Sequence, residues 1–142
     1  MAELIIDASV ALKWQLDEPQ SDKARKLLEP QYALLAPDFV LSEIANALFK
    51  SYRAGRVDDA FVKIAMEGAP RFFRSLLETP PLLQDAIKLA IELDHPVYDC
   101  VYVIAGQRLN APLITADQRF TAKLAGTPHA ANVVLLSTWQ GP

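Results

Sequence analysis

Short apolar runs alternate with helical stretches along this chain, and that alternation constrains the fold more than any other feature. Runs of this kind are typical of strands buried on both faces of a parallel sheet. We predict strands at residues 4–6, 32–36, 112–115 and 133–136, with an ambiguous segment at 72–78. We predict helices at residues 9–16, 20–29, 37–53, 58–67, 82–93, 97–109 and 117–124. The expected fold is therefore α/β, a three-layer α/β/α sandwich with a mainly parallel central sheet, in a single domain over residues 1–142.

Composition narrows the functional classes. A hydrophobic content of 51% in 142 residues can fill one core, and a net charge of −3 counts against a nucleic-acid binder unless cations neutralise part of it. The single cysteine, Cys100, excludes an intramolecular disulfide and a cysteine-cluster zinc site. No apolar stretch approaches the ~18 residues of a membrane span, and the N-terminus lacks the order of a signal peptide. We expect a soluble protein of the reducing cytoplasm.

Four acidic residues stand where folding alone does not readily explain a carboxylate. Asp7 ends the first apolar run, Asp117 follows the run at 112–115, Glu43 lies within an amphipathic helix and Asp99 within an apolar helix. Removing an ionised carboxylate from water is costly without a partner. Because the carboxyl ends of parallel strands meet at one edge of a sheet, Asp7 and Asp117 are expected there together.

Each acid also has an ordinary explanation. Asp7 and Asp117 suit helix N-caps, Asp99 suits the positive end of a helix dipole, and most helical glutamates such as Glu43 are exposed. Together, however, Asp7, Glu43, Asp99 and Asp117 supply oxygen ligands for one or two Mg²⁺ or Mn²⁺ ions. Such ions activate water and stabilise the charge that gathers on a phosphodiester. We therefore take these four acids as candidate catalytic residues and metal ligands.

Other polar residues lie close to the acids in sequence. The hydroxyls of Ser9 and Thr115 can hydrogen-bond a ligand carboxylate or a metal-bound water, although a helix start and a strand explain them equally well. Asn46 follows Glu43 by about one turn and can orient it, or simply face solvent. His95 and His129 are expected to be surface histidines rather than ligands, although His95 lies close to Asp99 in sequence, and Cys100 is expected to be a packing residue.

The segments IIDASVALKW, LSEIANAL, PVYDCVYVIA and PLITADQRF, in this order, resemble the PIN-domain ribonucleases, and most of all the toxin half of VapBC toxin–antitoxin pairs. This resemblance implies an α/β/α sandwich with a Mg²⁺- or Mn²⁺-dependent endoribonuclease site. It matches Asp7, Glu43, Asp99 and Asp117 to the family's acidic cluster, and Thr115 to the hydroxyl residue before its last acid. It also implies a homodimer and a small antitoxin that covers the active groove, with the helices at 39–53 and 58–66 as surfaces for both contacts.

The expected reaction is in-line hydrolysis of an RNA phosphodiester by a metal-activated water. RNA needs positive charge near the groove, and Lys13 and Arg119 are the best candidates because they follow Asp7 and Asp117 closely, although a solvated helix face is the more ordinary explanation of each. One alternative is a phosphatase that forms an aspartyl-phosphate on Asp7, which is disfavoured because Ser9 stands where such enzymes usually carry a second acid. The other is a non-catalytic PIN-like scaffold that binds RNA or protein.

Overall fold

The computed structural model describes residues 1–141, so the last residue of the expected domain, Pro142, lies outside the described residues. Its centre is a five-stranded sheet in the order β3-β2-β1-β4-β5, in which every neighbouring pair is parallel. The strands are β1 (Ala2–Ile6), β2 (Tyr32–Pro37), β3 (Ser75–Leu77), β4 (Leu113–Thr115) and β5 (Val133–Leu135). The predicted α/β/α sandwich is confirmed, and the ambiguous segment at 72–78 contains strand β3.

Within residues 1–141, seven helices connect the strands. They are α1 (Ala8–Gln15), α2 (Ser21–Arg25), α3 (Val40–Arg53), α4 (Asp59–Gly68), α5 (Leu83–Leu93), α6 (Val97–Leu109) and α7 (Gln118–Leu124). The helix predicted at 20–29 is shorter than expected, because the chain tightens into a 3₁₀ turn at Lys26–Leu28. Further 3₁₀ turns lie at Ala69–Phe72, Pro80–Leu82, Pro128–Asn132 and Leu136–Thr138.

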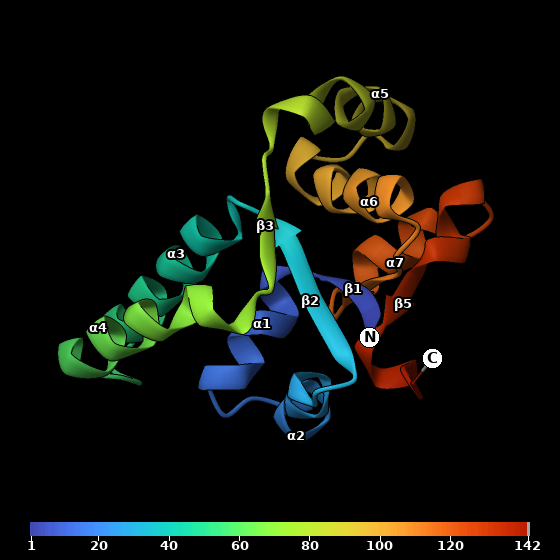
Figure 1. Ribbon diagram of the computed structural model, residues 1–142. Coiled ribbons are helices and arrows are strands. Elements are labelled where there is room, and N and C mark those ends of the chain that lie inside the picture. The colour runs from blue at the N-terminus through green and yellow to red at the C-terminus, as the bar shows by residue number, and fades with distance from the viewer. Residues whose placement is uncertain (142) are drawn as a thin grey trace.

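The order of the strands places the helices in two layers. From β1 the chain steps to β2 and β3 through α1–α4, and it then returns across the sheet to β4 and β5 through α5–α7. Because parallel crossovers are right-handed, steps in opposite directions put their helices on opposite faces. Figure 1 shows α3 beside α4 on one side of the strands and α5 stacked on α6 on the other, and α6 packs over β1, β2 and β4.

The same topology creates a switch point between β1 and β4. The connection that leaves β1 runs toward β2, whereas the connection that leaves β4 runs toward β5. Ligands of open α/β sheets bind beyond the carboxyl ends of the strands at such a point, because the diverging connections leave a crevice there. Asp7 follows β1 and Asp117 follows β4, so the fold brings both acids to this crevice.

The core lies on both faces of the sheet. Leu4, Ile5 and Ile6 of β1 are buried, and every residue of α6 from Cys100 to Gly106 is buried as well. A helix that is buried all round is a central element of the domain, as its apolar sequence predicted. None of the helices within residues 1–141 is long and apolar enough to cross a membrane.

Candidate active site

Asp7 lies at the end of β1 and is held by two hydroxyl groups. Ser9 Oγ donates to its Oδ1 at 2.6 Å and Thr115 Oγ1 donates to its Oδ2 at 2.5 Å. The backbone N–H of Val10 also donates to Oδ1, so the predicted N-cap is confirmed. Only 8% of Asp7 is exposed. The carboxylate is therefore both a cap and a buried acid at the switch point.

The charge of Asp7 is poorly compensated. Burial raises the pKa of its carboxyl to about 6, the bonds from Ser9 and Thr115 offset part of this rise, and the negative charge of Asp99 adds to it. Within residues 1–141 no basic side chain pairs with Asp7 or with Glu43. A buried carboxylate that lacks a basic partner and has another acid nearby is typical of a functional site.

Glu43 lies in the first turn of α3 and bonds to a tyrosine of α6. The hydroxyl of Tyr102 donates to Glu43 Oε1 at 2.5 Å. Burial and the charge of Glu43 raise the pKa of Tyr102, so its phenol stays protonated as the donor. Burial likewise raises the pKa of Glu43, with a smaller contribution from Asp99, while the bond from Tyr102 lowers it. Tyr102 was not predicted as a site residue, although a tyrosine in a buried helix needs a partner for its hydroxyl.

Asp99 lies in the first turn of α6 and contacts His95. The His95 Nε2 and Asp99 Oδ2 atoms are 2.6 Å apart, and the histidine side chain is only 16% exposed. His95 therefore lies partly exposed at the edge of the candidate site, where it contacts an acid. The turn at Pro96 places His95 one helical turn before Asp99, which the sequence distance suggested but did not establish. His129 is also partly exposed, but it bonds to Gln107 instead of an acid of the site.

Asp117 caps α7 as predicted and is linked to Asp7 through Thr115. Its carboxylate accepts the N–H of Phe120 at 3.0 Å, and its own N–H donates to Thr115 Oγ1 at 3.1 Å. The hydroxyl of Thr115 therefore joins the acids that follow β1 and β4. Ser9 has a similar place, because its Oγ accepts the N–H of Ala116 while it donates to Asp7.

Asn46 lies one turn after Glu43, as predicted, and lines a hollow of about 300 Å³ beside it. Phe39, Ser42 and Tyr98 line the same hollow, and Tyr98 is 63% exposed. The structure gives the Asn46 side chain no hydrogen bond to Glu43, so its orienting role stays a prediction. Cys100 is fully buried, and burial, aided by Asp99, raises the pKa of its thiol to about 11, which suits a packing residue.

The four acids are of the ligand type that binds a divalent cation, but their side chains do not converge on one point. Carboxylates are the ligands that Mg²⁺ and Mn²⁺ prefer, and the charge of Asp99 reaches both Asp7 and Glu43. In the part of the chain that the structure describes, however, no three acidic, histidine or cysteine side chains converge as a metal group. Each acid faces a hydrogen-bond partner of its own, so closing around an ion requires rotation of these side chains.

A family model of the PIN domain matches residues 4–124 of this chain. The chain belongs to the PIN domain family. It is 28% identical to ribonuclease VapC3 of Pyrobaculum aerophilum over 123 residues, which cover 85% of this chain and 94% of that protein. It is 33% identical to exonuclease VapC9 of the same organism over 84 residues, which cover 59% of this chain and 62% of that protein.

Solved structures agree with this assignment. The crystal structure of PAE2754 from Pyrobaculum aerophilum superimposes with a TM-score of 0.71 and 27% identity, covering 96% of this chain and 91% of that one. A toxin–antitoxin complex from Klebsiella pneumoniae contains a chain with a TM-score of 0.60. That chain is 16% identical, with 94% of this chain and 97% of that chain covered, so it shows the shared fold alone.

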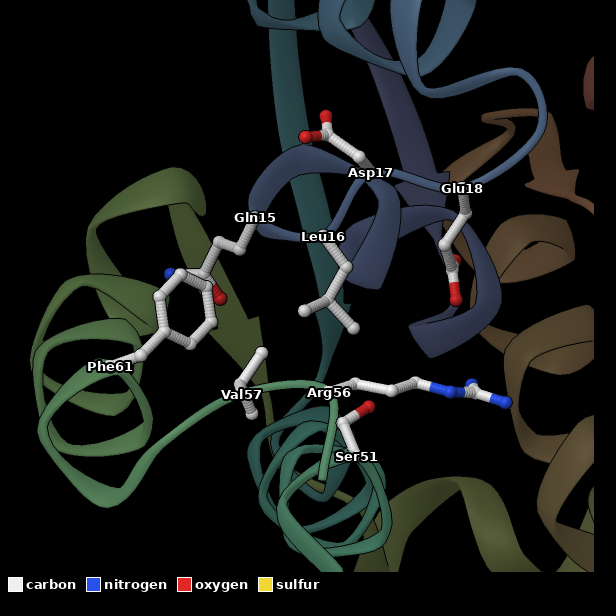
Figure 2. Close-up of a pocket in the computed structure, with 8 residues that line it drawn as sticks. All are labelled: Gln15, Leu16, Asp17, Glu18, Ser51, Arg56, Val57 and Phe61. Carbon is white, nitrogen blue, oxygen red and sulfur yellow. The ribbon is translucent and has the colours of Figure 1, made fainter. Parts of the chain in front are cut away.

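One pocket of this PIN domain lies away from the acids. Its volume is about 280 Å³, and Figure 2 shows Phe61 on one side of it and the Arg56 side chain on the other. Its lining includes Leu16, beyond the end of α1, and Ser51, in the last turn of α3. Asp7 and Glu43 stand at the opposite ends of these helices, and Ser51 lies about 12 Å further along the helix axis than Glu43. The pocket is therefore not part of the candidate site.

The two predicted RNA-binding cations differ in their surroundings. The Lys13 side chain is 13% exposed, and its Nζ lies 3.5 Å from Glu18 Oε1. This ion pair engages the ammonium group, and a contact of Lys13 with RNA stays a prediction. Arg119, in the first turn of α7 beside Asp117, is exposed.

Proposed function

We propose that this PIN domain is a Mg²⁺- or Mn²⁺-dependent endoribonuclease and the toxin of a VapBC-type toxin–antitoxin pair. The observation that carries the proposal is the buried Asp7 at the switch point of the sheet, where the charge of Asp99 acts on both Asp7 and Glu43 and hydroxyl groups rather than basic side chains hold these two acids. The similarity to ribonuclease VapC3 over 85% of the chain supports RNA as the substrate.

Asp7, Glu43, Asp99 and Asp117 would hold the ion. When bound, Mg²⁺ or Mn²⁺ supplies a water of lowered pKa and stabilises the negative charge of the phosphodiester. The chain's own contribution is orientation: Ser9 and Thr115 hold the two oxygens of Asp7, and Tyr102 holds one oxygen of Glu43. The exposed ring of Tyr98, beside Glu43, offers a stacking surface for an RNA base.

Cleavage of total and transfer RNA by the purified protein tests the proposal. We expect cleavage with Mg²⁺ or Mn²⁺ and none with EDTA, and we expect Glu43→Gln and Asp99→Asn each to lower the rate at least ~100-fold. Asp59→Asn is the matched control, because Asp59 is an exposed acid on α4. Cleavage that persists in EDTA, or in both site variants, would contradict a metal site at these acids.

The choice between endonuclease and exonuclease needs a separate substrate, because the relative VapC9 is named an exonuclease. A covalently closed circular RNA has no end, so only an endonuclease can open it. We expect the protein to linearise such a circle in the presence of Mn²⁺. Degradation of linear RNA with intact circles would assign an exonuclease instead.

A non-catalytic scaffold is the second candidate function. It is favoured by the present side-chain positions, in which the acids of the described chain do not form a ready metal group. A scaffold acts by binding, so Asp99→Asn should leave any growth inhibition by the protein intact. The nuclease proposal predicts that the same variant abolishes the inhibition.

We also propose a small antitoxin protein as a partner of α3 and α4. Four large apolar side chains are exposed on these helices, namely Phe49, Tyr52, Phe61 and Ile64. A neighbouring hollow of about 170 Å³, lined by Tyr52, Val62 and Lys63 among others, suits an apolar side chain of a partner. Coexpression with the product of a short open reading frame beside the gene should yield a complex, and Ile64→Asp should weaken it.

A homodimer is proposed on a different surface from the one predicted. Leu83, Ile87 and Ile91 follow one another at intervals of four along α5, and their exposed fractions are 41%, 49% and 76%. Residues at this spacing form one helix face, and an exposed apolar stripe marks an association surface. Sedimentation should show a dimer of the wild-type chain and a monomer of Ile87→Glu. A dimer that survives this change would exclude the α5 face.

A further inference from the structure

His95 lies where helices α5, α6 and α7 meet, beside Asp99 of the candidate site. Its backbone N–H bonds to Ala90 O at the end of α5, and Pro96 caps the start of α6 directly after it. Asp94, before it, adopts the left-handed conformation with φ of 50° that turns the chain from one helix to the next. The backbone of His95 is therefore held by the end of one helix and the start of another.

The His95 ring is fixed on three sides. Its centroid lies 4.7 Å from that of Phe120 on α7, with 33° between the ring planes. Nε2 lies 2.6 Å from Asp99 Oδ2, and Nδ1 lies 3.5 Å from Lys123 Nζ. The ammonium group of Lys123 is itself held by the carbonyl oxygen of Asp94 at 2.6 Å. A flip of the ring would lose the contact with Asp99.

These contacts decide which nitrogen of His95 faces the acid as a donor. An ammonium group can only donate, so Nδ1, which faces Lys123, is the accepting nitrogen. The hydrogen of the neutral imidazole therefore lies on Nε2 and is donated to Asp99 Oδ2. Oδ2 is held in place by this bond, while Oδ1 of Asp99 accepts no hydrogen bond from residues 1–141.

We propose that His95 is a positioning residue that orients the Asp99 carboxylate toward the cation site, an inference that rests on the proposed function. Because Phe120 belongs to the helix that Asp117 caps, the histidine also couples the orientation of Asp99 to the element that carries the fourth acid. Hydrogen-bond partners of metal-ligating side chains fix the geometry of the ligands, and their loss lowers metal affinity by about 10–100-fold.

Titration of the metal-free protein with Mn²⁺ in a calorimeter tests this role. His95→Phe keeps a ring against Phe120 and removes the donor, and we expect it to weaken Mn²⁺ binding about 10–100-fold. His95→Gln returns an N–H donor to the end of the side chain and should restore most of the affinity. His129→Phe is the matched control, because His129 also lies near an acid, with Nε2 3.4 Å from Glu92 Oε2, but outside the site.

Two comparisons separate the possible failures. Asp99→Asn should lose Mn²⁺ binding; if it binds as the wild type does, both the metal site and the role of His95 are wrong. If Asp99→Asn loses Mn²⁺ binding while His95→Phe keeps it, the metal site stands and the role of His95 alone is overturned. A lower urea midpoint of His95→Phe would not change this conclusion, because the test is Mn²⁺ affinity. His95→Asn, whose amide is too short to reach Asp99, replaces His95→Phe if that variant does not fold.

Discussion

The hydroxyl oxygen of Tyr102 lies 2.5 Å from Glu43 Oε1 and joins helix α6 to helix α3 at the candidate site. Tyr102 is only 1% exposed, and its ring packs against Phe39 with 5.2 Å between the ring centroids. Because the phenol is buried and protonated, its hydrogen has a fixed acceptor. The hydrogen bond thereby holds the Glu43 carboxylate at the candidate site instead of leaving it free to turn to solvent.

Removal of this hydroxyl should weaken both the fold and the site. We expect Tyr102→Phe to lower the free energy of unfolding by about 1 kcal/mol, as loss of one hydrogen bond does. The bond lowers the pKa of Glu43, so the variant should raise that pKa and require a higher pH for cleavage. Urea unfolding and the pH dependence of RNA cleavage measure the two effects. Tyr98→Phe, at an exposed ring, is the control and should change neither stability nor the pH profile.

Neutralising Asp7 should stabilise the metal-free protein at neutral pH. Its carboxyl has a pKa of about 6 when folded and 3.8 as the ordinary value, so between these values the folded chain binds more protons than the unfolded chain. Stability therefore falls as the pH rises through this window, by up to about 3 kcal/mol, and the cost persists above pH 6. Asp7→Asn, measured in EDTA, should be more stable than the wild type at pH 7 and nearly equal at pH 4.

The stability of Asp7→Asn relative to the wild type at pH 7 tests whether the charge of Asp7 is compensated. Asn keeps an oxygen for the Ser9 and Val10 donors, and its NH2 group can donate to Thr115 Oγ1, which reverses the direction of that hydrogen bond. Urea unfolding at pH 4 and pH 7 gives both values. Lower stability of Asp7→Asn at pH 7 would show that the charge of Asp7 is better compensated than its burial indicates.

Divalent cations should reverse the repulsion among the acids. An ion that binds only the folded chain stabilises it by about 2.7 kcal/mol at a hundredfold excess over its dissociation constant. We expect Mn²⁺ to raise the melting temperature of the wild type at pH 7 and to leave that of Glu43→Gln almost unchanged. An equal rise in both proteins would place the stabilising ion away from Glu43.

Two glycines should respond to alanine in opposite directions. A Cβ at Gly106 in α6 would lie 2.8 Å from Ala111 O and 3.0 Å from Asn132 Nδ2, and these two atoms are hydrogen-bonded to each other. We expect Gly106→Ala to cost about 1–3 kcal/mol through overpacking. Gly68, at the end of α4, has only Gln15 Nε2 at 3.8 Å, so Gly68→Ala should gain about 0.4–1 kcal/mol. Equilibrium unfolding of both variants checks the contrast.

Several features of the site followed from local sequence. Asp7 and Asp117 cap helices directly after parallel strands, and capping depends only on a few neighbouring residues. The contacts of Ser9 and Thr115 with Asp7 agree with the hydroxyl pattern beside the strand-end acids. The catalytic roles of these residues, and of Asn46, stay predictions that the proposed variants test.

Local patterns thus determined the layers, the parallel sheet and the edge at which the acids lie. Short apolar runs and helix caps each depend on a few neighbouring residues, so the sequence shows them directly. Tertiary packing decided the rest. The Tyr102–Glu43 bond joins residues 59 positions apart, and the His95 ring packs against Phe120 of another helix. Packing also left the α5 stripe of Ile87 and Ile91 exposed. Such contacts depend on how helices dock on the sheet, which the periodicity of any one segment does not encode.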